Sequence, residues 1–236
     1  MNPSSCRNLM KTPPLRRQWT ASFFAALLLS VCGFSGCLSR PSLNKQTFTF
    51  GAPAISATNV AAGSRVLGIR NLQIAAPFEG RPLVYRTGDF SYVRDPYAGF
   101  LESPADELIG PVRASLRSNG DFGAVVETGS ALKANTLVEI SVSQLFGDFR
   151  QPGHPAAVLA MRLVFFDAPN GIPGKVFFQQ EYSRTIPLRA PTAAALMTGW
   201  NQALGEILAQ LASDLQNSPE AAEFRPIHST PEGTQK

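Results

Sequence analysis

The sequence holds very little cysteine. Its three cysteines, Cys6, Cys32 and Cys37, all lie within the first 37 residues of a 236-residue chain. The segment that follows Cys37 therefore has no disulfide and no thiolate metal ligand to stabilise it. A chain of about 200 residues can bury enough hydrophobic surface to fold without either, so we expect one domain stabilised by its core.

An excess of positive charge is absent from most of the chain. The whole sequence contains 21 Lys and Arg residues against 17 Asp and Glu residues. Four basic residues and no acidic residue precede Cys37, so the remainder is balanced at 17 against 17. Nucleic-acid binding needs clustered, surplus Lys and Arg. The pI of about 9.2 therefore does not indicate a nucleic-acid-binding protein.

Groups for catalysis and metal binding are scarce as well. The two histidines are His154, in a loop with Pro and Gly neighbours, and His228, near the end of the sequence. Neither has the nearby Cys or carboxylate partners that a zinc site requires, and no G-x-S-x-G nucleophile motif occurs. Gly171–Lys175 has too few residues between its glycines for a phosphate-binding loop. The sequence therefore predicts no enzyme, no metal site and no cofactor.

No apolar run is long enough to predict a membrane span. A transmembrane helix needs about 20 apolar residues, and the run from Ala21 to Phe34 is shorter. It follows Arg16 and Arg17 and is closed by Ser35-Gly36-Cys37, an order typical of an export signal. A cysteine directly after such a cleavage site marks a lipoprotein. The pattern predicts that residues 1–36 are a signal peptide and that Cys37 becomes the acylated N-terminus.

Two alternatives remain open for this segment. An uncleaved transmembrane anchor would need a longer apolar run. Cleavage before Cys32 would place the branched Val31 next to the cut, whereas Ser35 and Gly36 before Cys37 are small. In enterobacteria, an aspartate directly after the acylated cysteine is the usual mark that retains a lipoprotein in the inner membrane. Here Leu38 follows Cys37. We therefore predict a lipid anchor in the outer membrane, with the domain facing the periplasm.

The chain after the signal divides into three parts. Residues 37–46 contain a proline and no apolar period, which indicates a short tether. Residues 47–216 carry the regular hydrophobic patterns of one domain. Residues 217–236 contain three prolines and few large apolar residues, which predicts a disordered tail.

Two short strand regions are expected early in the domain. The first is residues 46–50, where Phe48 and Phe50 alternate with threonines. The second is residues 66–74, where a change of parity predicts either a bulge or a strand buried on both faces. Residues 83–86 and 89–93 flank Thr87-Gly88, which indicates a tight hairpin.

The first expected helix begins at Ser103, with Pro104 in the first turn and Asp106 three residues after the cap. Negative charge at Asp106 and Glu107 suits the positive end of a helix dipole. Gly110-Pro111 predicts a kink or a restart, because an interior proline costs about 3 kcal/mol. A second helix, capped by Thr192, carries apolar residues at helical spacing: Leu196, Trp200, Leu204, Ile207, Leu208, Leu211 and Leu215.

Three longer strands are predicted between the helices, at residues 137–145, 156–166 and 176–186. Their alternation is typical of a sheet with one solvated face, and Asn170-Gly171 favours a hairpin turn. We therefore expect an α+β fold with an antiparallel-rich β-sheet and two helices packed on one face. Phe166 and Phe177 lie on the opposite parity from the inward set, so they could form an exposed apolar strip.

Several segments of the domain, together with the lipoprotein signal, resemble one protein family. They are Phe48-Thr49-Phe50, Val66–Ile69, Leu83–Arg86 and Phe100–Leu108. The family is that of ABC-type transport auxiliary lipoprotein components, which includes the outer-membrane lipoprotein of the paraquat-inducible MCE transport system. The resemblance extends from Thr47 to Leu215.

The resemblance implies a non-catalytic accessory subunit. Such a subunit would contact an MCE-domain protein and ABC transporter subunits that move phospholipid or another hydrophobic molecule between the inner and outer membranes. The residues expected to contact the partner are Tyr85, Arg86, Tyr92 and Arg94. Two alternatives remain, an outer-membrane assembly lipoprotein and a periplasmic hydrolase.

Overall fold

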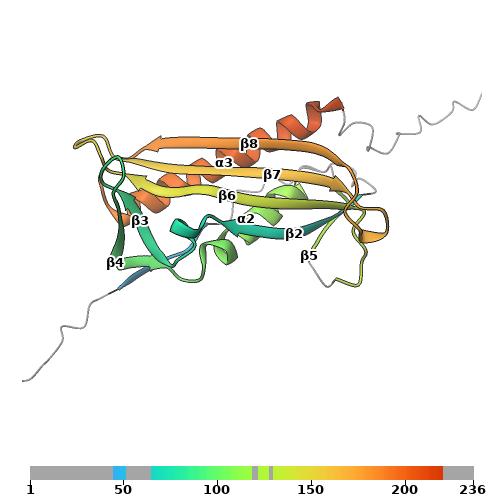
Figure 1. Ribbon diagram of the computed structural model, residues 1–236, viewed down its shortest axis with the longest axis horizontal. Helices are drawn as coiled ribbons and strands as arrows, with labels where there is room; N and C mark the ends of the chain where they lie inside the picture. Colours follow the sequence, from blue (N-terminus) through green and yellow to red (C-terminus); the bar gives the residue numbers. More distant parts are fainter. Residues whose placement is uncertain (1–44, 52–64, 119–121, 128–129, 220–236) are drawn as a thin grey trace, which may run out of the picture. The chain divides into compact units, whose positions relative to one another are not determined.

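The alternating hydrophobic segments of the second half form three long strands, as predicted. The computed structural model describes residues 45–51, 65–118, 122–127 and 130–219. It contains β6 (Thr136–Asp148), β7 (Ala156–Asp167) and β8 (Val176–Pro187), with β7 antiparallel to both neighbours (Figure 1). The turn after β7 places Asn170 and Gly171 at φ of 60° and 80°, a backbone that Asn and Gly adopt readily. The expected meander is confirmed.

The rest of the sheet is joined largely by parallel pairing, so the expectation of an antiparallel-rich sheet was only partly right. β2 (Val66–Ile74) runs parallel to β6 and to β5 (Ala124–Glu127), and β1 (Gln46–Phe48) runs parallel to β4 (Tyr92–Phe100). β3 (Pro82–Arg86) is antiparallel to β4 but parallel to the far end of β6. The described strands thus form an eight-stranded mixed sheet. Strand periodicity reports which face is buried and not the direction of the neighbouring strand.

The first helix, α2 (Pro104–Ser118), begins where the sequence predicts. The Ser103 hydroxyl oxygen accepts a hydrogen bond from the Asp106 N–H at 3.2 Å. The helix continues through Pro111 without a break, so the expected restart does not occur. Leu108, Val112 and Leu116 are each 0% exposed, and their burial on one face holds the two halves of the helix together.

The second helix, α3 (Ala193–Asn217), is capped by Thr192, whose side chain accepts from the Ala195 N–H at 3.2 Å. Its predicted apolar stripe is buried. Trp200 stacks on Phe100 at 5.6 Å, and its indole N–H donates to the Val158 carbonyl at 3.1 Å. α3 contacts β7 and β8, and α2 contacts β2 and β5. Figure 1 shows both helices on the same face of the sheet, as predicted.

A small second core lies on the other face, at the end of the sheet formed by β3 and β4. A register shift in β6 between Val142 and Gln144 places Leu145 on the helix face and Phe146 on the opposite face. Phe146 is 4% exposed there. Phe78, from the 3-10 turn Ala76–Phe78, and Tyr92 cover it with ring centroids at 5.7 and 5.6 Å. This packing fixes the hairpin of β3 and β4 to the sheet.

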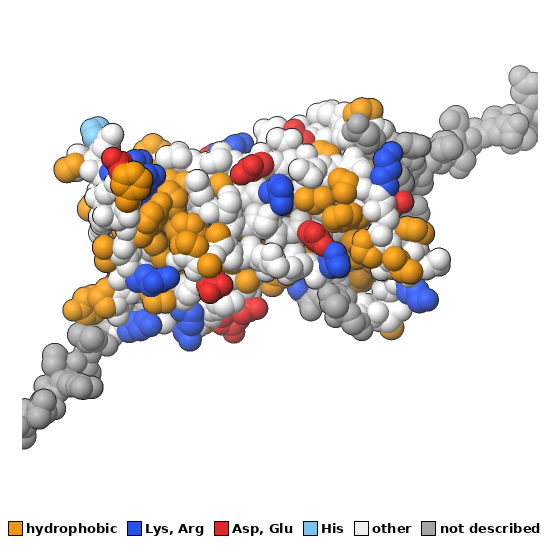
Figure 2. Space-filling view, viewed as in Figure 1, with side chains coloured by type: hydrophobic (Ala, Val, Ile, Leu, Met, Phe, Trp, Pro, Cys, Tyr) orange, Lys and Arg blue, Asp and Glu red, His pale blue; other side chains and the backbone are white. Residues whose placement is uncertain are grey.

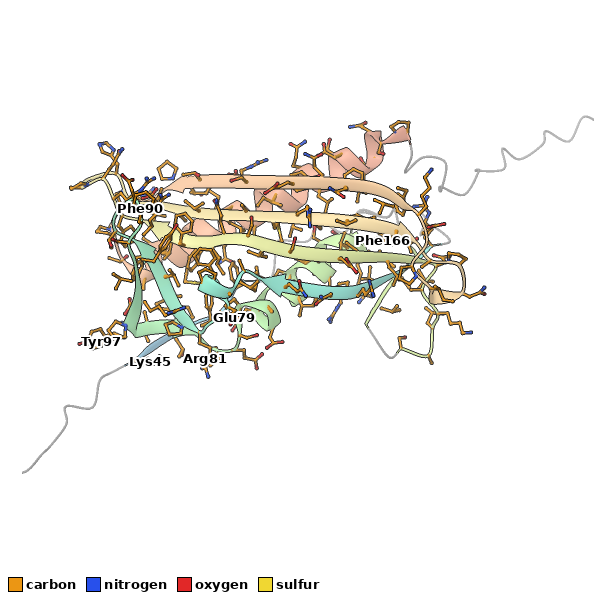
Figure 3. All side chains as sticks on the ribbon, in the orientation of Figure 1. Lys45, Glu79, Arg81, Phe90, Tyr97 and Phe166 are labelled. Atoms are coloured by element: carbon orange, nitrogen blue, oxygen red, sulfur yellow. The ribbon has the colours of Figure 1, made fainter. Side chains whose placement is uncertain are left out.

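The expected strip of Phe166 and Phe177 does not form. Phe177 is 6% exposed and contacts Phe165 at 6.1 Å between centroids. A register shift between Phe165 and Phe166 in the pairing of β7 with β8 turns Phe177 inward. Phe166 remains partly exposed (Figure 3). Strand β5, which the sequence did not predict, completes the sheet beside β2.

The described residues contain no helix that is long and apolar enough to cross a membrane. Cys37, the signal peptide, most of the tether and residues 220–236 lie outside the described residues, so the predictions made for them stay predictions.

Candidate interaction site

The hairpin of β3 and β4 carries all four residues predicted to bind a partner. Its strands pair Arg86 with Tyr92 and Tyr85 with Val93. The Thr87 N–H donates to the Ser91 carbonyl at 2.9 Å, so residues 87–91 form the connection. It is longer than the tight turn predicted at Thr87-Gly88, and β4 begins at Tyr92 rather than at Asp89.

Tyr85 supports the hairpin from inside. Its hydroxyl donates to Asp95 Oδ2 at 2.6 Å, and its ring stacks on Phe149 at 4.8 Å. Burial, followed by the hydrogen bond to Asp95 and the charge of Asp95, raises the pKa of the Tyr85 phenol. The side chain is therefore a neutral, half-buried hydrogen-bond donor at physiological pH, and most of its surface already contacts the protein itself.

Arg86, Tyr92 and Arg94 lie together on the opposite face of the hairpin. The Arg86 guanidinium lies 5.8 Å from the centre of the Tyr92 ring and donates to the carbonyls of Gly88 and Asp89. Tyr92 is 46% exposed, and the exposed Arg94 donates to the Pro77 carbonyl at 3.3 Å. We call these three residues the cationic face. Backbone bonds hold both guanidinium groups in place while leaving polar surface exposed on Arg94.

An ion cluster fixes the tip of the hairpin to the end of β6. Arg150 donates to Asp148 Oδ2 at 2.7 Å and to Asp89 Oδ1 at 3.1 Å. The hydrogen bond from the Arg150 side chain is the main cause that holds the pKa of the Asp148 carboxyl below its usual range. Because all three groups are solvent-accessible, the cluster positions the tip more than it stabilises the fold.

Exposed apolar side chains gather on the same hairpin. Phe90 at the tip is 98% exposed, Val93 is 50% exposed and Tyr97 is 52% exposed. We call these three residues the aromatic edge. Figure 2 shows a group of hydrophobic side chains at this end of the sheet and others at the opposite end, and Figure 3 shows Phe90 and Tyr97 at opposite ends of the hairpin. Sequence reasoning missed this surface, although aromatic residues in and beside a turn of Gly, Asp and Ser could have indicated it.

From Pro96 to Ala98, the open edge of β4 offers no free backbone donor to another strand. β1 pairs with it only from Ala98 to Phe100. Before that point, the N–H groups of Tyr97 and Ala98 both donate to Asp95 Oδ1, at 2.8 and 3.0 Å. Pro96 has no N–H at all. These features are typical of an edge strand that does not pair with another chain.

Glu107 holds the N-terminal strand on the domain. The residue is 9% exposed, and its carboxylate accepts hydrogen bonds from the Thr49 hydroxyl, the Phe50 N–H and the Glu102 N–H. The sequence explained Glu107 by the helix dipole alone, and the tertiary contact was not predicted. The contact ties the segment that leads toward Cys37 to the start of α2.

Two grooves flank α2, with volumes of about 410 and 360 Å³. The first is lined in part by Glu107 and Asp106 and the second by Asp106, Arg70 and Arg113. The Glu107 carboxylate already accepts backbone hydrogen bonds, and the Asp106 carboxylate accepts one from the Ser103 hydroxyl. Within the described residues, no group of three or more His, Cys, Asp or Glu side chains could hold a metal ion.

The chain matches no protein-family model and no curated protein sequence. An uncharacterized protein of known crystal structure aligns with 73% of this chain and 99% of its own, at 14% identity and a TM-score of 0.57. Protein XCC0632 from Xanthomonas campestris, of DUF330, aligns over 76% of this chain and 97% of its own, at 16% identity and a TM-score of 0.57. At these identities the two similarities show a shared fold.

A lower similarity is to lipoprotein GNA1162 from Neisseria meningitidis. It covers 65% of this chain and 98% of that one, at 12% identity and a TM-score of 0.35. That score is too low to add to the fold assignment.

Proposed function

We propose that this protein is a lipid-anchored accessory subunit of an ABC/MCE-type transport system. Acylated at Cys37 in the outer membrane, it faces the periplasm and contacts the MCE-domain protein and ABC transporter subunits. The system moves phospholipid or another hydrophobic molecule between the two membranes. The subunit is non-catalytic and needs no cofactor.

The observation that carries the proposal is the small number of residues between the predicted anchor and the first strand of the domain. Only residues 38–45 separate Cys37 from β1, which pairs with β4 and continues into the segment bonded by Glu107. A lipid anchor on so short a connection confines the domain to a thin layer beside the membrane. It thereby raises the effective concentration of the domain near a membrane-spanning partner.

The segments that resemble the transport family support the proposal at this same end of the domain. Leu83–Arg86 forms most of β3, and Phe100–Leu108 covers the end of β4 and the start of α2. The cationic face lies on this hairpin, with the exposed Arg94 beside the aromatic Tyr92. Arg and Tyr are enriched in protein interfaces, so we assign the partner contact to this face.

Co-purification from cross-linked membranes tests the proposal. We expect the full chain to bring down an MCE-domain protein and an ABC subunit, and the Arg94→Glu variant to lose them. Lys175→Glu is the matched control. Lys175 is also exposed, but it lies just before β8, which begins at the end of the sheet away from the hairpin. Recovery of an outer-membrane β-barrel protein instead would support the assembly-lipoprotein alternative and contradict the proposal.

A further inference from the structure

We propose that the aromatic edge, formed by Phe90, Val93 and Tyr97, contacts the lipid bilayer that holds the Cys37 anchor. This second contact would orient the domain on the membrane. The inference rests on the lipid-anchoring part of the proposed function and not on the identity of the transport partner.

The length of the connection places the hairpin close to the membrane. Lys45 lies eight positions after Cys37, and an extended chain spans at most about 3.5 Å per residue, or roughly 28 Å. The register of β1 with β4 pairs Gln46 with Ala98, so the chain enters the sheet beside Tyr97. Figure 3 shows Lys45 next to Tyr97. The aromatic edge is therefore the apolar surface adjacent to the point where the anchor joins the domain.

The aromatic edge extends from that point along the whole of the hairpin. Tyr97 lies seven positions after Phe90, which corresponds to at most roughly 23 Å of extended chain. That length is within the reach of the connection, so Phe90 and Tyr97 can touch one membrane surface at the same time. Tyrosine and phenylalanine are suited to the boundary between headgroups and acyl chains, because each ring is apolar and the tyrosine hydroxyl stays hydrated.

Charge on the hairpin favours the same contact. Its two carboxylates are engaged within the protein, Asp89 by Arg150 and Asp95 by Tyr85 and two backbone N–H groups. Lys45, Arg81 and Arg94 are exposed on or near the hairpin, and the exposed carboxylates near its base are Glu79 and Glu102, so the cations exceed the free carboxylates by one. Exposed cations beside apolar residues attract anionic headgroups.

A bilayer fits this surface better than an added protein strand. An added strand needs a row of backbone donors and acceptors, and the N–H groups at residues 96–98 are missing or already bonded to Asp95. Lipid contact needs only apolar side chains, which the aromatic edge provides. The cationic face lies on the other side of β4 and stays available to the transport partner.

Site-specific fluorescence on the lipidated full chain tests the proposal. The mature chain has no reactive thiol once Cys37 is acylated, so Phe90→Cys provides a single labelling site for an environment-sensitive dye. Ile172→Cys is the matched control, because Ile172 is also an exposed apolar turn residue, at 67%, and lies beyond the other end of β7. Phe90 is 98% exposed, so its replacement leaves the core unchanged.

Each labelled protein is placed in vesicles of phosphatidylethanolamine and phosphatidylglycerol that contain a lipid with a nitroxide headgroup. We expect a blue-shifted emission and several-fold stronger quenching at position 90 than at position 172, with Tyr97→Cys behaving like position 90. Equal quenching at 90 and 172 would overturn the proposal. The proposal would also be overturned if the dye at position 90 stayed unquenched and the same position could be cross-linked to a protein. Loss of the transport partners in co-purification would contradict the proposed function while leaving this quenching pattern intact.

Discussion

Replacing Glu107 by alanine tests how the N-terminal strand is held on the domain. The buried carboxylate accepts from the Phe50 N–H at 3.2 Å and from the Glu102 N–H at 3.1 Å, as well as from the Thr49 hydroxyl. Its removal leaves both backbone N–H groups without an acceptor in the protein. The Thr49 hydroxyl loses less, because the Phe50 carbonyl lies 3.4 Å away.

The size of the effect follows from these contacts. A hydrogen bond to a charged group contributes about 1.5–3 kcal/mol net to stability. The two backbone bonds share one carboxylate, so their contributions are not additive. We expect Glu107→Ala to lower the free energy of unfolding by about 3 kcal/mol. Glu107→Gln keeps one acceptor oxygen, and we expect it to lose about half as much.

Urea unfolding measures this change. The midpoint should fall while the slope stays constant, because the folded core is the same. Hydrogen exchange should also quicken at the Leu101 N–H, which donates to the Phe48 carbonyl at 2.8 Å. Glu206→Ala is the control, since Glu206 lies exposed on α3 and its replacement should change stability by less than about 0.5 kcal/mol. A Glu107→Ala protein as stable as this control would refute the reasoning.

Three further predictions concern the core, the anchor and the ion cluster. Trp200→Ala should cost about 4 kcal/mol, measured by urea unfolding, because Trp200 is 0% exposed and donates to the Val158 carbonyl; a loss under about 1 kcal/mol would contradict it. Cys37→Ala should leave a folded protein that moves from the membrane fraction to the soluble fraction, and unchanged fractionation would argue against the anchor. The lowered pKa of Asp148 means that this carboxylate adds stability above its unfolded pKa of about 3.9, which is lost as the pH falls through the folded value. Arg150→Ala should therefore lose less stability on acidification than the parent, as measured by thermal unfolding at a series of pH values.

Local patterns in the sequence predicted most of the elements but not the way the sheet is assembled. Thr192 and Ser103 cap the helices as expected, and the alternation in β6, β7 and β8 identified their buried faces. The parallel partners of β6 were not predicted, because β2 and β3 reach it only through long connections. β5 was too short to show a period.

The features of the candidate interaction site also differ in whether the sequence predicted them. The hairpin itself was predicted, but its register was not. The longer connection pairs Tyr85 with Val93 and Arg86 with Tyr92, whereas a tight turn at Thr87-Gly88 would have paired Arg86 with Asp89. The inward turn of Phe177 depends on a one-residue register shift, which brings the adjacent Phe177 and Phe178 both into contact with Phe165. The turn residues around Phe90 gave a local signal for an exposed aromatic side chain, but the exposure of Val93 and Tyr97 depends on which elements pack against β4, and that is decided by the tertiary structure.

The sequence by itself determined the cysteine-free composition of the domain, the predicted acylation site, the helix caps and the buried faces of the long strands. Each of these depends on residues that are close together in the chain, where backbone geometry alone decides which groups meet. Only the tertiary structure decided the mixed strand order, the burial of Glu107 against Phe50 and the placement of the aromatic edge beside Lys45. Those features join residues that are far apart in sequence, and their positions follow from how the sheet and helices share one core.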